Sequence, residues 1–163
     1  MEVRYLILAR YAEFGPDGRL NLIGGDHNRF VADSYPYIHP LLVAATRIII
    51  NREDCDQEHE FASLIIEENT GDLVAEGGSG TIPKLTIPPD APMLGTGIIL
   101  EFKDMIFPRE GRYVARLIID QKMMAEAGFR VAPGSYYRGL MEGGRVTVQG
   151  GEPDGSHDRG PDQ

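Results

Sequence analysis

Tryptophan is absent from this chain of 163 residues, and cysteine occurs once, at Cys55. A single cysteine cannot form an intramolecular disulfide, so the fold must be held together by buried apolar surface and not by cross-links. The first residues, Met1 to Arg4, also lack the cationic region and apolar core of a signal peptide. Together these absences predict a protein of the reducing cytoplasm.

Long hydrophobic runs and positive charge are also scarce. The longest apolar run, Leu41 to Ala45, is separated from Ile48 to Ile50 by Thr46 and Arg47. It falls far short of the ~20 residues that cross a bilayer, so we expect no membrane span. The chain has 16 Lys and Arg against 25 Asp and Glu, which gives a net charge of -9. Since nucleic-acid affinity comes mostly from cations that neutralise phosphates, we expect no nucleic-acid partner.

Several segments alternate apolar and polar residues with a period of two, which is typical of β-strands. The plainest is Ile98 to Asp120, where Pro108 and Gly111 suit a turn between two alternating arms. The pattern predicts a long β-hairpin there. Val3 to Ala12 alternates in the same way and is followed by a Gly- and Pro-containing turn and a short return strand.

The number and spacing of such segments predict an all-β fold of about seven to eight strands. No helical segment is long enough to connect parallel strands, so we expect an antiparallel β-sandwich of immunoglobulin-like or jelly-roll topology. Residues 1–133 would form this domain, 134–149 a C-terminal extension, and 150–163 a disordered acidic tail poor in apolar residues. Gly77 to Gly97, rich in Gly, Ser, Pro and Thr, is predicted to be an irregular connection.

The apolar segment Leu41 to Ile50 is the first candidate for function. Its alternation places Leu42, Ala44, Ile48 and Ile50 on one face and Leu41, Val43, Arg47 and Ile49 on the other. A sandwich core covers one face of a strand, so the second face needs another cover. We predict that Leu41, Val43, Arg47 and Ile49 bind a partner, either a second copy of this chain or another protein.

The second candidate is the acidic loop Asp54 to Glu60. Its potential metal ligands are Asp54, Asp56, Glu58 and His59. The carboxylates would suit Ca²⁺ or Mg²⁺ and a Cys/His pair would suit Zn²⁺, but the spacing matches no known metal motif. A solvated loop is therefore the preferred interpretation, and we expect no metal. Gly77 to Thr81 lacks the lysine of a phosphate-binding loop, so we expect no cofactor either.

Four segments of this sequence resemble those of a known family. The segments Leu8 to Glu13 and Asp17 to Gly25, followed by Tyr35-Pro36 and the late segment Phe107 to Tyr113, are similar to those of a bacterial domain-of-unknown-function family of small all-β proteins. The resemblance covers about residues 3 to 132. It implies a β-sandwich in a bacterial cytoplasm and supplies neither an activity nor catalytic residues.

These observations favour an uncharacterised, non-catalytic β-sandwich that binds a protein or self-associates. The alternative is a metal-dependent or small-molecule-binding enzyme that uses the acidic loop Asp54 to Glu60. An ion site or polar pocket at that loop would favour the enzyme, while an apolar surface open to another chain would favour the binding module.

Overall fold

A computed structural model describes residues 1–136 and 138, and almost all of their regular structure is β-strand. The predicted all-β fold is confirmed. Residues 134–136 and 138 add a helical turn. The predicted tail at 150–163, and most of the predicted extension 134–149, lie outside the described residues. The strands are β1 (Glu2–Ala9), β2 (Tyr11–Phe14), β3 (Leu20–Ile23), β4 (Arg29–Val31), β5 (Tyr37–Asn51), β6 (His59–Glu67), β7 (Leu73–Ile82), β8 (Met93–Phe107), β9 (Gly111–Ile119) and β10 (Lys122–Ala132).

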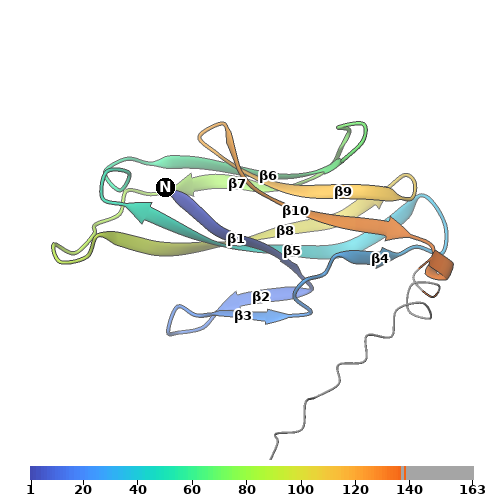
Figure 1. Cartoon of the computed structure of the whole chain (residues 1–163), viewed down its shortest axis with the longest axis horizontal. Coiled ribbons are helices and arrows are strands. Elements are labelled where there is room, and N and C mark those ends of the chain that lie inside the picture. Colours follow the sequence, from blue (N-terminus) through green and yellow to red (C-terminus); the bar gives the residue numbers. More distant parts are fainter. Residues whose placement is uncertain (137, 139–163) are drawn as a thin grey trace, which may run out of the picture.

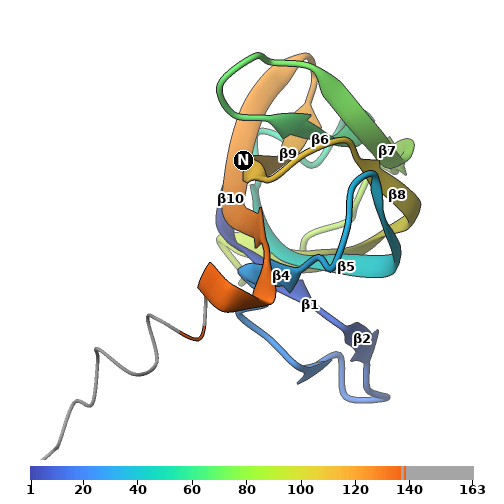
Figure 2. The ribbon, with the colours of Figure 1, turned by 90° about the vertical axis from the view of Figure 1, so that its right-hand side faces the viewer.

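The strands form two larger sheets and one small hairpin. The three-stranded sheet has the order β1-β5-β8, the five-stranded sheet has the order β4-β10-β9-β6-β7, and β2 pairs with β3. All of these pairs are antiparallel except β4 with β10. The two larger sheets face each other and curl, so that their strands surround a common interior (Figures 1 and 2).

The interior is filled by the inward side chains of both sheets. From the three-stranded sheet come residues such as Leu42, Ile48 and Phe102, and from the five-stranded sheet residues such as Leu117 and Val131, all of them fully buried. The period of two along each strand therefore places one apolar set in the core, as the sequence predicts.

The predicted hairpin over Ile98 to Asp120 is wrong. Both arms are strands, but β8 pairs with β5 in one sheet whereas β9 pairs with β6 and β10 in the other. The turn between β8 and β9 thus connects the two sheets. Beside this turn, the buried Tyr113 hydroxyl donates a hydrogen bond to the carbonyl oxygen of Arg109, at 2.7 Å.

The predicted irregular connection Gly77 to Gly97 is also wrong at both ends, because β7 continues through the glycines to Ile82 and β8 begins at Met93. A Cβ atom added at Gly77 would lie only 2.3 Å from the ring of Phe102, which is fully buried. Only glycine lets the strand approach this ring so closely. The glycines here serve packing within a strand and do not mark a loop.

Strands β5 and β8 change faces together near Asp104, which has a φ of 49°. Before this point on β8 the buried side chains are Leu100 and Phe102, and after it the buried ones are Met105 and Phe107. The change turns the cross-strand neighbours Ile38 and Ile106 outward, where they are 59% and 54% exposed.

The β2–β3 hairpin lies over the outer face of the three-stranded sheet (Figure 2). Ala12 of this hairpin packs with Val43 and Ala45 of β5, and a Cβ atom at Gly97 would lie 2.2 Å from the ring of Phe14. The hairpin turn forms as its Gly- and Pro-containing sequence predicts, with Gly18 at a φ of 71°. The second apolar face of β5 is therefore covered by the chain itself at Val43 and Ala45.

Candidate functional site

The predicted partner-binding residues of β5 lie on one face, but they are not equally accessible. Val43 is 2% exposed beneath the β2–β3 hairpin, whereas Leu41, Arg47 and Ile49 are partly exposed. The Arg47 guanidinium lies over Gly95, where an added Cβ atom would come within 2.6 Å of Nη2. A partner that needed Val43 would have to displace the hairpin first.

In the acidic loop, His59 is a buried structural link. Its Nδ1 lies 2.7 Å from Oδ2 of Asp120, and its Nε2 lies 2.8 Å from the carbonyl oxygen of Asp54. The other carboxylate oxygen of Asp120 accepts a hydrogen bond from the amide of Glu60, at 3.1 Å. The Asp54 side chain pairs with the N-terminal amine of Met1. Together these contacts tie the loop to the β9–β10 turn and to the start of the chain.

The surroundings of His59 favour its charged form. Burial of the ring alone would lower its pKa, but the hydrogen bonds to Asp120 and to the Asp54 carbonyl outweigh burial, and the net shift of the His59 pKa is upward. The hydrogen bond from His59 in turn lowers the pKa of Asp120. Since both ring nitrogens already face oxygen acceptors, neither is available to a metal ion in this arrangement.

The other candidate ligands do not join His59. Asp56 and Glu58 are exposed, and Asp54 is only partly buried. Within the part of the chain that the structure describes, no group of three or more His, Cys, Asp or Glu side chains is arranged to hold a metal ion. No helix among the described residues is long and apolar enough to span a bilayer.

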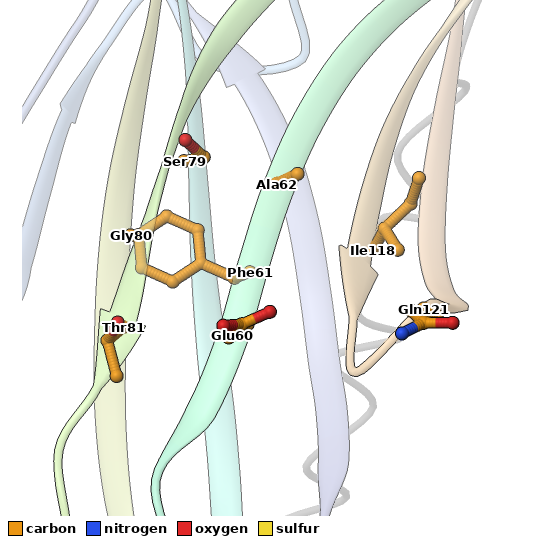
Figure 3. A pocket seen from close by; sticks show the side chains of 8 residues that line it. All are labelled: Glu60, Phe61, Ala62, Ser79, Gly80, Thr81, Ile118 and Gln121. Atoms are coloured by element: carbon orange, nitrogen blue, oxygen red, sulfur yellow. The ribbon is translucent and has the colours of Figure 1, made fainter.

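Sequence reasoning missed the groove on the outer face of the five-stranded sheet (Figure 3). Its volume is about 430 Å³, and it crosses β7, β6 and β9 before reaching the β9–β10 turn. Its lining residues are Glu60, Phe61, Ala62, Ser79, Gly80, Thr81, Ile118 and Gln121.

The groove exists because short side chains meet on neighbouring strands. The strand register places Met123, Ile118, Ala62 and Ser79 in one row across β10, β9, β6 and β7. Ala62 and Ser79 fill little space in this row, whereas Ile118 stands beside them (Figure 3). Met123, at the end of the row, is 55% exposed. The result is an apolar depression that remains open to solvent.

The chemistry of the lining suits binding more than catalysis. Glu60 is the one titratable side chain among the lining residues, while Thr81 and Gln121 add neutral polar groups at the rim. A carboxylate without a second acid, base or nucleophile beside it does not form a catalytic pair. An apolar floor with a polar rim is instead the usual anatomy of a protein contact.

Residues 4–132 match the model of a protein family described as a family of unknown function, DUF6941. No curated protein matches the chain significantly.

Solved structures give distant likenesses. A glycosyl hydrolase family 2 member from Bacteroides cellulosilyticus has a TM-score of 0.33 at 14% identity, over 59% of this chain and 13% of its own. The alkylpurine DNA glycosylase AlkC of Pseudomonas fluorescens, bound to DNA with an abasic site analog, has a TM-score of 0.36 at 12% identity, over 77% and 30%. A family 2 β-glucuronidase has a TM-score of 0.32 at 12% identity, over 66% and 13%. This chain thus spans less than a third of each of these proteins, and at such scores none indicates its function.

Proposed function

The chain belongs to the family of unknown function DUF6941, and we propose that it is a non-catalytic protein-binding module whose groove over β6, β7 and β9 receives an apolar side chain of its partner. The observation that carries this proposal is the groove of about 430 Å³ on a sheet face that no described strand covers. An open apolar depression of this kind is where the anchor residues of an interface usually lie.

The negative charge of the chain indicates which type of protein would bind at the groove. The chain has a net charge of -9, and Glu60 stands at the rim of the groove with Glu58 close to it in the sequence. A second copy of the chain would bring the same negative charge to this face, and like charges oppose association. The groove therefore favours a different protein, with Lys or Arg next to the apolar residue that it inserts.

The experiment compares two matched variants as bait in an extract of the native host. Ala62→Leu fills the groove from its floor, whereas Gly128→Leu adds the same side chain on β10, outside the groove lining. We expect a partner that is retained by the unmodified chain and by Gly128→Leu but lost from Ala62→Leu. With the purified partner, calorimetry should show at least about tenfold weaker binding for Ala62→Leu, which is about 1.4 kcal/mol. Equal capture by both variants would contradict the proposal.

Self-association is the second candidate, and the exposed cross-strand pair Ile38 and Ile106 favours it. Ile38 lies on β5, the strand of the predicted contact Leu41, Val43, Arg47 and Ile49, and Ile106 lies opposite it on β8. Both are outside the part of the sheet where the β2–β3 hairpin covers Val43. Light scattering at tens of micromolar tests this candidate: a dimer that Ile38→Asp dissociates would support it, and a monomer would exclude it at that concentration.

An enzyme at Asp54 to Glu60 is less well supported, because His59 is engaged at both ring nitrogens. We further propose a location in a bacterial cytoplasm, since Cys55 is a free thiol. The proposed architecture remains a β-sandwich of immunoglobulin-like or jelly-roll type, with the two larger sheets as its layers.

A further inference from the structure

A second cavity lies where the two larger sheets meet without pairing. Strands β1 and β10 are neighbours in space, but β1 pairs only with β5, and β10 pairs with β9 and, at its end, with β4. The space between them is a slot of about 210 Å³ whose apolar walls include Leu6 and Leu8 on one side and Ala127 and Gly128 on the other. It is separate from the groove, with which it shares no lining residue.

The backbone at the walls of this slot has free hydrogen-bonding capacity. The Leu8 carbonyl accepts a hydrogen bond from the His27 amide, at 3.0 Å, so the polar groups of Leu8 point away from β5. Because alternate residues of a strand point their polar groups the same way, those of Leu6 face the slot as well. On the other wall, the Arg130 amide donates a hydrogen bond to the carbonyl oxygen of Asn28. By the same alternation, the backbone polar groups of Gly128 point into the slot. No backbone hydrogen bond joins Leu6 to Gly128 across it in the described chain.

His27 also lines the slot, and its side chain carries an imidazole ring. Its ring packs edge-on against Phe30, with 4.6 Å between the ring centroids, and this contact holds its orientation. Burial, followed by the nearby charge of Arg10, lowers the His27 pKa, so the ring is neutral at pH 7. A neutral imidazole offers one donor and one acceptor. Among the described residues, no hydrogen-bonding partner of the His27 ring is found.

We propose that this slot binds a small neutral molecule, about the size of one ring, that carries an amide or hydroxyl group. The apolar walls would enclose the ring, and the polar group would meet His27 and the backbone of Leu6 or Gly128. The size fits, because an apolar cavity of roughly 150 Å³ is enough to hold benzene. A charged ligand suits the slot less well, since Asp26 and Arg10, which lie near His27, carry opposite charges.

The test uses benzamide as the probe and follows the backbone amides of Leu6 and Gly128 by NMR. We expect saturable shifts at both positions. Gly128→Leu should weaken binding at least about tenfold, and the protein should still fold, because a Cβ atom there meets nothing closer than 4.0 Å. Ala62→Leu, in the separate groove, is the matched control and should leave the benzamide affinity unchanged.

A second variant tests the polar group. His27→Phe keeps a ring against Phe30 and removes both nitrogens. Benzamide should then bind several-fold more weakly, as the loss of one hydrogen bond implies, while toluene should bind equally to both proteins. The proposal fails if benzamide causes no saturable shifts at up to about 10 mM, an affinity too weak to count as specific. It also fails if Gly128→Leu binds benzamide as well as the unmodified chain.

Discussion

Two histidines of this protein, His59 and His39, occupy opposite electrostatic surroundings. His59 is buried against two oxygen acceptors, and its pKa is raised. Nδ1 of His39 lies 2.9 Å from the Tyr37 hydroxyl, and the His39 ring packs on the ring of Phe30. The pKa of His39 is lowered by burial and then by His27. Protonation at lower pH therefore favours the folded state at His59 and disfavours it at His39.

We predict that Asp120→Asn lowers the pKa of His59. Asparagine tolerates the positive φ of this turn position, 49°, and keeps a hydrogen-bond acceptor, but it removes the negative charge. The stability that comes from the raised His59 pKa is fully present when the pH is below the pKa of His59 in the unfolded chain, about 6.5. This stability is lost as the pH rises through the pKa of His59 in the folded protein. Asp120, whose pKa is lowered in the folded protein, contributes stability above about pH 3.9. It loses this contribution as the pH falls through its pKa in the folded protein.

The measurement is an NMR titration of the His59 ring, combined with melting curves at about pH 5.5 and pH 9. Asp120→Asn should destabilise the protein more at the lower pH, where the unmodified pair is fully charged. The His27 pKa serves as the internal control and should not move. An unchanged His59 titration in the variant would show that Asp120 does not hold its proton.

We also predict that His39→Gln reduces the loss of stability on acidification. Because the folded pKa of His39 is depressed, the native state binds fewer protons than the unfolded chain as pH falls below about 6.5, and stability drops. Glutamine removes this proton uptake. Urea unfolding at pH 7 and about pH 5.5 should give a smaller difference in free energy for the variant, and identical differences would contradict the assignment.

At the scale of the elements, β5 has buried residues on both of its faces. Its inner face forms the core with Leu42 and Ile48, while Val43 and Ala45 on its outer face pack beneath the β2–β3 hairpin. This double cover explains the run of apolar residues on both faces of one strand. The hairpin thus occupies much of the face that a partner was expected to fill.

Substitutions on the outer face of β5 test whether the β2–β3 hairpin or a partner covers Val43. Val43→Asp should destabilise the folded chain by more than about 3 kcal/mol, because it buries an unpaired charge beneath the hairpin. Ile49→Asp, on the same face but partly exposed, is the matched control and should cost much less. Urea unfolding measures both. If Val43→Asp stays fully stable and only changes the oligomeric state, then the hairpin does not cover this residue in solution.

For the whole molecule, acidity and surface shape are the two features on which the proposed function rests. A net charge of -9 and an open apolar groove suit recognition of another protein. The acidic loop adds to this charge, but its central His59 is bound internally.

We therefore predict that Ca²⁺, Mg²⁺ or Zn²⁺ at micromolar concentrations leaves the melting temperature unchanged within about 1 °C, since a ligand specific for the native state must raise it. Differential scanning calorimetry with and without a chelator provides the measurement. Stabilisation by one ion that is lost in Asp56→Ala with Glu58→Ala would restore the metal-site hypothesis for the loop. These two residues are exposed, so the double variant should fold normally.

The sequence by itself determined which residues of a strand share a face and where the turn of the β2–β3 hairpin lies. Leu42 and Ile48 separate from Leu41 and Val43 by their period of two, and Gly18 marks the β2–β3 turn. Both features follow from local backbone geometry, which neighbouring residues encode directly. The all-β class and the family resemblance come from the same local patterns.

Only the tertiary structure decided which strands are partners and what covers each face. His59 meets Asp120 across 61 positions of sequence, and the groove depends on Ala62, Ser79 and Ile118 from three strands. The sequence pattern of β8 and β9 is compatible with one hairpin, yet the two strands lie in different sheets. Pairing depends on how much apolar surface the closed fold can bury from distant segments, and a period of two is compatible with many such pairings.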